Sequence, residues 1–110
     1  MDYPIWDMPG GVVDDGETFS DAAVREAKEE TGFEIEILSK VGTYHRVKKN
    51  DIQHIFCGKI IGGKSIGSGP ETRELKWFSF DKLPLFMVPN RRRQIKDYLK
   101  GIQNEKFTLR

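Results

Sequence analysis

The sequence predicts a single domain of mixed α/β class. Three observations support this: a well-capped helical segment at 19–31, two alternating segments after it, and a length of 110 residues. A chain of 12.7 kDa buries roughly two-thirds of its extended surface on folding, enough for one modest core without metal or disulfide staples. We therefore expect one domain over 1–110, with a loosely held tail at 102–110.

The first elements are expected to be a short strand and a long helix. Residues 5–8 (IWDM) predict a strand that enters a glycine-rich loop. A helix is expected over 19–31, because Thr18 with Asp21 forms a variant capping box and the segment is rich in Ala, Glu, Lys and Arg. Gly32 stands where a left-handed C-cap belongs.

The middle of the chain predicts strands. The apolar and polar residues of 33–47 alternate well enough for a strand, and the residues KKND then turn the chain. Residues 52–61 (IQHIFCGKII) predict its antiparallel partner, and a further strand is expected over 74–80 after the loop GGKSIGSGP.

A second helix is expected over 91–100. Asn90 is the predicted N-cap and Gly101 the stop signal.

Composition excludes several classes of protein. Eighteen Lys plus Arg against seventeen Asp plus Glu leave a net charge of +1, which predicts neither a nucleic-acid partner nor a membrane surface. No apolar run is long enough to span a membrane. The single cysteine, Cys57, cannot form an internal disulfide, and no secretory signal opens the chain. We therefore expect a cytoplasmic protein.

Three glutamates of the first predicted helix are expected to share a face. Glu26, Glu29 and Glu30 stand at i, i+3 and i+4, within roughly a third of the helix circumference, on the side of Ala22 and Phe19. Three anions that face inward repel one another unless a positive charge lies among them. Oxygen ligands without nearby His or Cys suit Mg²⁺ or Mn²⁺, and Mg²⁺ usually shares its shell with substrate phosphates. The pattern favours phosphate chemistry.

The segment 11–33, GVVDDGETFSDAAVREAKEETGF, resembles the Nudix box. That motif runs Gly, five residues, Glu, seven residues, Arg-Glu, an aliphatic position, any residue, Glu-Glu, any residue, Gly and a hydrophobe. Ala27 is a small occupant of the aliphatic position, and Trp6 with Met8-Pro9-Gly10 resembles the usual approach to the box. The fixed positions are Gly11, Glu17, Arg25, Glu26, Glu29, Glu30 and Gly32.

The resemblance implies a Nudix-type α/β/α sandwich around a mixed sheet and a MutT-like hydrolase. Such an enzyme cleaves a phosphoanhydride in a nucleoside diphosphate linked to another group, with Mg²⁺ as cofactor and Mn²⁺ as substitute. The implied metal ligands are Glu26, Glu29, Glu30 and the backbone carbonyl of Gly10.

The resemblance also implies roles for further residues. Glu29 and Glu30 would be metal ligands and Glu26 a ligand or the general base, while Arg25 would orient a glutamate. Glu17 would support the turn between loop and helix or an outer metal. Glu71 precedes Trp77 as a further glutamate does in some relatives, where it lies on a loop over the metals as ligand or base. Glu74 is a weaker candidate for that position.

The chain departs from the family before the box. Only ten residues precede Gly11, whereas Nudix domains usually carry thirty or more, so the usual N-terminal strands are expected to be lacking and the fold to be N-terminally shortened. A misassigned start, a trimmed chain, a shorter sheet and an edge covered by a second copy are all consistent with this. For a native length of 110 residues we expect a homodimer or a swapped assembly, because an uncovered sheet edge invites aggregation.

Other patterns favour structural roles. GKIIGGKS (58–65) matches a P-loop, but the IGSGP that follows cannot open a helix, so a hairpin loop is expected. The run 91–93 (RRR) could meet substrate phosphate or RNA, although such a run is usually a solvated face. His45 and His54 are expected to be structural or exposed, and Cys57 a small buried hydrophobe.

The hypothesis from sequence is thus a Mg²⁺-dependent pyrophosphohydrolase with a small nucleotide-type substrate. The alternative is a non-catalytic, Nudix-like nucleotide-binding or regulatory module. Nucleoside triphosphates, dinucleotide polyphosphates, ADP-ribose and capped or triphosphorylated RNA ends all stay open as substrates, since no substrate signature occurs outside the box.

Overall fold

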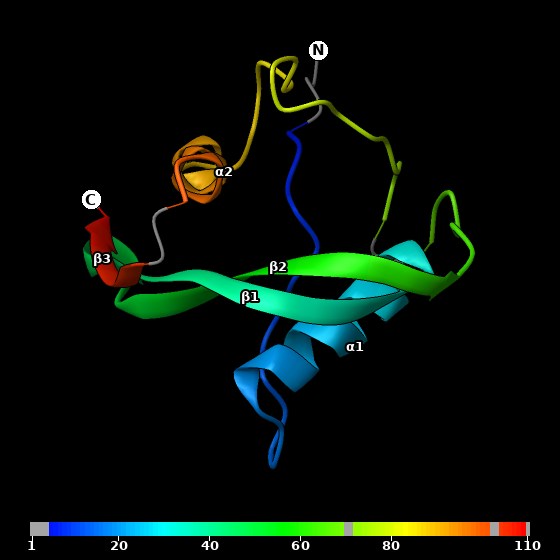
Figure 1. The fold of residues 1–110 in the computed structure, drawn as a ribbon, viewed down its shortest axis with the longest axis horizontal. Coiled ribbons are helices and arrows are strands. Elements are labelled where there is room, and N and C mark those ends of the chain that lie inside the picture. Colours follow the sequence, from blue (N-terminus) through cyan, green and yellow to red (C-terminus); the bar gives the residue numbers. More distant parts are fainter. Residues whose placement is uncertain (1–4, 70–71, 102–103, 110) are drawn as a thin grey trace. The chain divides into compact units, whose positions relative to one another are not determined.

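The computed structural model describes residues 5–69, 72–101 and the backbone of 104–109. Two helices, three strands and a 3₁₀ turn follow one another along this part of the chain (Figure 1). In order they are α1 (Phe19–Thr31), β1 (Phe33–Arg46), the 3₁₀ turn (Val47–Lys49), β2 (Asp51–Gly63), α2 (Arg91–Leu99) and β3 (Asn104–Leu109).

The strands form one sheet in the order β2-β1-β3. β1 and β2 are joined by the 3₁₀ turn and run side by side in opposite directions (Figure 1), whereas β3 pairs with β1 in parallel. The sheet is therefore mixed, as predicted. β3 itself was not predicted, and its pairing with β1 is irregular between Gly42 and Tyr44.

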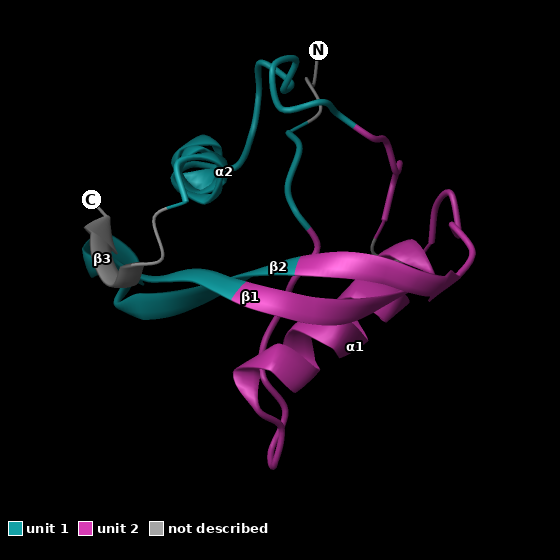
Figure 2. Ribbon diagram, in the orientation of Figure 1, with its two compact units in different colours: residues 1–8, 40–57, 78–110 teal, residues 9–39, 58–77 magenta. Residues whose placement is uncertain are grey.

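The chain divides into two compact units (Figure 2). Unit 1 comprises Met1–Met8, Lys40–Cys57 and Phe78–Arg110, and unit 2 comprises Pro9–Ser39 and Gly58–Trp77. Both β1 and β2 contribute residues to the two units. A single domain over 1–110 stays a prediction.

Helix α1 of unit 2 begins and ends at the predicted residues. The Thr18 hydroxyl accepts a hydrogen bond from the Asp21 N–H at 3.1 Å, which satisfies one donor of the first turn. Gly32 ends the helix with a φ of 86°. A Cβ at Gly32 would lie 2.0 Å from the Lys64 carbonyl oxygen, so only glycine permits both this conformation and this close approach.

Unit 1 is held together by buried polar contacts of α2. The hydroxyl of Tyr44, a fully buried residue on β1, donates to Asp97 Oδ2 at 2.8 Å. Burial raises the pKa of Tyr44, and the hydrogen bond to Asp97 raises it further. Gln94 is also fully buried, and its amide nitrogen donates to Gln53 of β2 at 3.0 Å. Two hydrogen bonds from buried side chains therefore hold α2 against the strands.

Two predicted strands are absent from the described residues. The segment 5–8 makes a single parallel bridge, in which Trp6 bonds through its N–H and carbonyl to the backbones of Phe86 and Val88. The segment 74–80 is irregular, because its backbone turns toward nearby loops: the Leu75 N–H donates to the carbonyl of Gly67 at 3.1 Å. Alternation alone does not supply the neighbouring strand that a ladder requires.

The helix α2 spans 91–99 and begins without the predicted side-chain cap. Asn90 adopts a left-handed conformation with a φ of 75°, whereas a capping side chain reaches the first turn from extended backbone. Its carbonyl still accepts the first helical hydrogen bond, from the Gln94 N–H. Gly101 follows with a φ of 70°, consistent with its predicted stop role.

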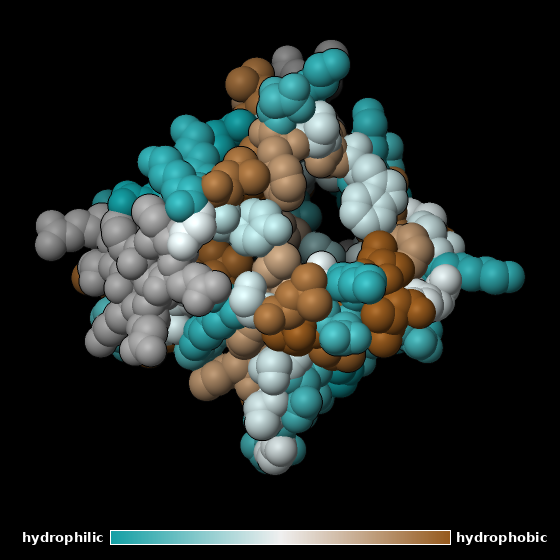
Figure 3. Space-filling model, in the orientation of Figure 1, coloured by the Kyte–Doolittle hydropathy of each residue, from teal (hydrophilic) through white to brown (hydrophobic). Residues whose placement is uncertain are grey.

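The apolar core is small. Among the described residues, the buried hydrophobic side chains are Ala22, Ala27, Val41 and Tyr44, whereas Leu85 and Trp77 are 82% and 77% exposed. Figure 3 shows apolar groups at the surface of the molecule. Cys57 is half-buried rather than buried, which corrects the expectation from sequence. None of the helices in the described ranges has the length and apolarity needed to cross a bilayer.

We predict that Tyr44→Phe destabilises the protein by about 1–3 kcal/mol, because the buried carboxyl group of Asp97 loses the donor that compensates its desolvation. Urea unfolding at pH 7 measures the change. Tyr98→Phe removes the hydroxyl of an exposed tyrosine of the same helix, whose hydrogen-bond partner is the weakly polar thiol of Cys57, and should change stability by less than about 0.5 kcal/mol. Equal effects of the two substitutions would contradict the assigned role of Asp97.

Candidate active site

The three glutamates of α1 differ in their exposure. The Glu26 side chain is 12% exposed and that of Glu29 is 54% exposed, while Glu30 is half-buried. Phe19, expected on the same inward face, is itself half-exposed. The inward face predicted from helical spacing therefore holds for Glu26 and only in part for the other two glutamates.

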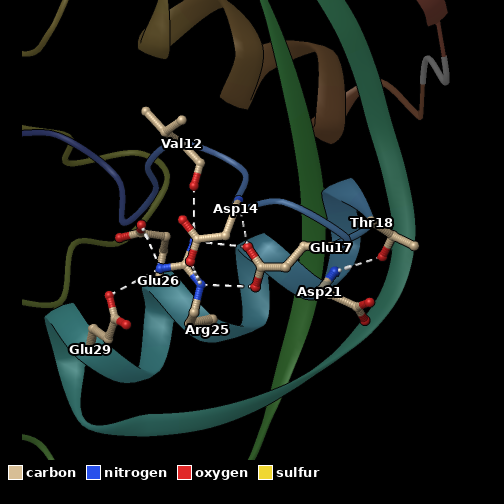
Figure 4. A network of polar contacts seen from close by, with 8 residues as sticks. All are labelled: Val12, Asp14, Glu17, Thr18, Asp21, Arg25, Glu26 and Glu29. Carbon is tan, nitrogen blue, oxygen red and sulfur yellow. Dashed lines mark hydrogen bonds and ion pairs between the residues drawn. The ribbon is translucent and has the colours of Figure 1, made fainter.

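Arg25 supplies the positive charge among these acids (Figure 4). Its guanidinium donates from Nη1 to Glu26 at 2.9 Å and to Glu29 at 3.2 Å. Arg25 and Glu29 stand at i and i+4, which are neighbours on a helix, so one side chain reaches both carboxylates.

The same guanidinium ties the preceding loop to α1. Nε and Nη2 donate to the two carboxylate oxygens of Glu17 at 2.9 and 3.0 Å, and Nη2 also donates to the Val12 carbonyl at 2.9 Å. Asp14 lies 3.4 Å from Nε. These contacts and those to the helix glutamates use all five N–H donors of the arginine. Sequence reasoning missed the contacts with Val12 and Asp14, and no motif marks them.

The contacts within this network shift two pKa values in opposite directions. The hydrogen bond from Arg25 lowers the pKa of Glu17 below its ordinary value of 4.5, and the Asp14 N–H, which donates to the same carboxylate at 2.8 Å, lowers it further. The hydrogen bonds to Glu17 and Glu26 raise the pKa of Arg25. Both side chains are therefore charged across the neutral range.

Two glutamates contact the backbone of the glycine loop. The Gly10 N–H donates to Glu30 Oε2 at 2.7 Å. A Cβ at Gly11 would lie 2.4 Å from Oε1 of Glu26, so the absence of a side chain at this residue leaves the room that the Glu26 carboxylate occupies. The loop and the helix thus bring Glu26 and Glu30 to adjacent glycines.

The segment after β2 is fastened to the C-terminal end of α1. The Thr72 hydroxyl donates to the Glu30 carbonyl at 2.8 Å, and the Ile66 N–H donates to the Thr31 carbonyl at 2.9 Å. Thr72 was not singled out from sequence. Glu71, the predicted residue over the metals, lies outside the described residues, whereas Glu74 is exposed.

The donor set is chemically suited to a hard divalent cation. Glu26, Glu29 and Glu30 offer carboxylate oxygens, and Gly10 adds a backbone carbonyl, which are the ligand types that Mg²⁺ prefers. Within the described ranges, no three acidic, histidine or cysteine side chains converge closely enough to hold an ion. Glu29 and Glu26 are instead held by Arg25.

The other candidate residues of the described chain receive no hydrogen bond from Arg25. Residues 58–63 belong to β2, and no helix follows before Arg91 in the described chain, so the P-loop match has no structural counterpart. His45 and His54 lie on β1 and β2 and belong to unit 1, whereas the glutamates belong to unit 2. Burial lowers the pKa of His54, and the nearby charge of Lys40 lowers it further.

One known protein family matches most of this chain. The family model of the NUDIX domain matches residues 2–99. The chain belongs to the Nudix family, and its class is that of the MutT-like Nudix hydrolases, which act on nucleotide pyrophosphate bonds.

Two individual proteins resemble the chain over most of its length. The chain is 51% identical over 109 residues to a Bacillus subtilis (strain 168) protein named "Putative 8-oxo-dGTP diphosphatase", covering 99% of this chain and 73% of that protein. It is 34% identical to the ADP-ribose pyrophosphatase of Methanocaldococcus jannaschii, covering 84% of this chain and 56% of that protein.

Solved structures show the same fold. A crystal structure of an ADP-ribose pyrophosphatase from Streptococcus suis matches with a TM-score of 0.75 and 23% identity, over 94% of this chain and 82% of that one. At this identity the likeness establishes the mixed α/β Nudix fold alone.

We predict that Glu17 contributes stability that is lost in acid. Its folded pKa lies below the unfolded value of 4.5, so the contribution is present above pH 4.5 and disappears as the pH falls through the folded pKa. Glu17→Gln should lower the melting temperature at pH 7 and flatten the decline of stability below pH 4.5. Calorimetry across this range measures both effects.

Glu36→Gln is the matched control, since Glu36 is an exposed glutamate of β1 without an ion pair among the described residues. It should leave the melting temperature at pH 7 unchanged. An acid decline as steep in Glu17→Gln as in the native chain would show that Arg25 does not stabilise the loop through Glu17.

Proposed function

We propose that the chain is a Mg²⁺-dependent nucleotide pyrophosphohydrolase whose substrate is a nucleoside triphosphate with an oxidised purine, such as 8-oxo-dGTP. The observation that carries the catalytic part is the meeting of Glu26 and Glu30 with adjacent glycines, while Arg25 holds Glu26 and Glu29. The choice of nucleotide is supported by the 51% identity to the Bacillus protein.

Each residue of the site would have its own role in the proposed reaction. Glu26, Glu29, Glu30 and the Gly10 carbonyl would hold Mg²⁺, which when bound supplies charge neutralisation at the diphosphate and lowers the pKa of water. Arg25 restrains the carboxylates through charge-assisted hydrogen bonds and fixes the loop that carries the glycines. Glu26 or Glu71 would accept the proton of the attacking water.

Further properties belong to the same proposal. The layers would be those of an α/β/α sandwich, Mn²⁺ would replace Mg²⁺, and the enzyme would act in the cytoplasm as a homodimer. In unit 1, the apolar side chain of Leu85 is 82% exposed, which is consistent with a covered surface. Sedimentation velocity tests the dimer, which a monodisperse monomer would contradict.

We expect Glu29→Gln and Glu30→Gln each to reduce kcat/KM by at least about 10²-fold with the fold retained, because each removes a negative ligand from the proposed metal site. Phosphate and pyrophosphate release measure the activity, with Mg²⁺ and with Mn²⁺. The panel is 8-oxo-dGTP, dGTP, ADP-ribose, a dinucleotide polyphosphate and a triphosphorylated RNA. Glu36→Gln, on the exposed side of β1, should retain full activity.

The outcome of the substrate assays decides between the proposed substrate, the assigned site and the non-catalytic alternative. Faster hydrolysis of 8-oxo-dGTP than of dGTP supports the proposed substrate, and preference for ADP-ribose overturns that part alone. Undiminished hydrolysis in both glutamate variants overturns the assigned site. Mg²⁺-dependent nucleotide binding without turnover of any compound supports the non-catalytic module instead.

Gly11→Ala should weaken Mg²⁺ binding by about 10-fold or more, because the added methyl group would collide with the Glu26 carboxylate and displace it. Isothermal titration calorimetry with MgCl₂ measures the affinity without substrate. Gly67→Ala serves as a loop-glycine control, because a Cβ there would meet no atom within 4 Å, and its expected effect is limited to stability, since Gly67 has a φ of 70°. Unchanged Mg²⁺ affinity in Gly11→Ala would contradict the proposed position of Glu26.

A further inference from the structure

The C-terminal end of helix α1 receives hydrogen bonds from the segment that follows β2. The last carbonyls of an α-helix have no partner within the helix, so they need donors from outside it. The Thr31 carbonyl accepts from the Ile66 N–H at 2.9 Å. The Glu30 carbonyl accepts from the Thr72 hydroxyl at 2.8 Å. The segment after β2 therefore caps two adjacent residues at the end of α1.

The Thr72 hydroxyl is presented by a backbone that is itself held in place. Thr72 and Gly69 form an antiparallel bridge, in which each N–H donates to the carbonyl of the other residue, at 3.1 and 2.7 Å. The Leu75 N–H donates to the Gly67 carbonyl at 3.1 Å. Because these bonds already order the backbone around Thr72, little further conformational entropy is lost when the hydroxyl binds the helix end. The hydrogen bond to α1 is therefore a rigid link.

Glu30 is linked to two segments of the chain at once. Its carboxylate accepts from the Gly10 N–H at 2.7 Å, and its carbonyl accepts from Thr72, which lies 42 residues further along the chain. Gly10 and Thr72 belong to unit 2, as α1 does. The direction of a helical side chain follows from the backbone that carries it, so the bond at the carbonyl of Glu30 also helps to fix its carboxylate.

The last turn of α1 carries two of the three glutamates of the candidate active site. Glu29 and Glu30 are the third-last and second-last residues of the helix, whereas Glu26 lies a turn earlier. Helix ends open more readily than helix middles, because their backbone groups have fewer partners. Opening of the last turn would move Glu29 and Glu30 and leave Glu26 in contact with Arg25. The geometry of the site therefore depends on the donors that close this turn.

We infer that Thr72 is a positioning residue of the metal site and acts through the backbone of Glu30. Its hydroxyl keeps the last turn of α1 helical, so that the carboxylates of Glu29 and Glu30 stay where a divalent cation can bind them. This role requires no contact of Thr72 with the cation or the nucleotide. The inference rests on the proposed function, which assigns Mg²⁺ to these glutamates.

Thr72→Val tests this role, because it removes the hydroxyl and keeps the shape of the side chain. Isothermal titration calorimetry with MgCl₂ measures the affinity in the absence of substrate. The variant should bind Mg²⁺ about 5-fold more weakly or worse, because residues that hold metal ligands in place contribute strongly to metal affinity. Thr72→Ser keeps the donor and should bind Mg²⁺ within about 2-fold of the native chain.

Thr18→Val is the matched control, since the Thr18 hydroxyl caps the other end of the same helix. Both valine variants should lower the melting temperature by a few degrees, because each removes one hydrogen bond from an end of α1. The first turn of α1 carries none of the three glutamates. The Mg²⁺ affinity of Thr18→Val should therefore stay within about 2-fold of the native value.

The Mg²⁺ affinities distinguish a positioning role from a general loss of stability. Equal affinities of Thr72→Val and the native chain would overturn the inference and leave the proposed function standing. Equal losses in Thr72→Val and Thr18→Val would overturn it too, because lower stability of α1 would then explain both. A loss in Thr72→Ser as large as in Thr72→Val would show that the hydroxyl is not the cause. Absence of Mg²⁺ binding by the native chain would overturn the metal assignment of the proposed function, and this inference with it.

Discussion

The candidate site depends on one guanidinium placed among carboxylates. Three glutamates on adjacent turns of a helix repel one another, and in low-dielectric surroundings that repulsion grows. Arg25 offsets it with donors to Glu26 and Glu29, and its remaining donors engage Glu17 and the Val12 carbonyl. A single planar group therefore sets both the spacing of the acids and the path of the loop before the helix.

This arrangement explains why the arginine and the glycines belong to the same motif. The guanidinium holds the loop at α1, and the loop can then bring its backbone against the carboxylates only where no side chain intervenes. Gly10 donates to Glu30, and Gly11 leaves room for Glu26. Lysine could not replace the arginine here, because it lacks the fixed fork of five donors. The charge of Arg25 and the close approach of the glycine backbone therefore act together on the glutamates.

In unit 1, buried polar side chains hold helix α2 against the strands. The docking of α2 uses Tyr44, Asp97, Gln94 and Gln53, and the buried apolar residue Val41 lies nearby in the sequence of β1. Buried hydrogen bonds specify a geometry more strictly than apolar contact does, because any misplacement leaves a polar group unsatisfied. These contacts hold the helix in one rotation.

Features with local causes could be predicted from the amino-acid sequence alone. Helix α1 was predictable to the residue because Thr18 and Gly32 cap it, and the paired strands were predictable because their alternation matches the pleat. The family was evident from the spacing of the box. The helix caps, the strand alternation and the box spacing each involve residues that are close together in the sequence.

Tertiary structure decided whatever requires a distant partner. The parallel strand β3 exists through its pairing with β1, while the segment 74–80 alternates but lacks a neighbouring strand among the described residues. The direction of the Arg25 side chain is set by Glu17 and Val12, which lie eight and thirteen residues away. Each of these depends on which groups folding brings together, and no local pattern records that.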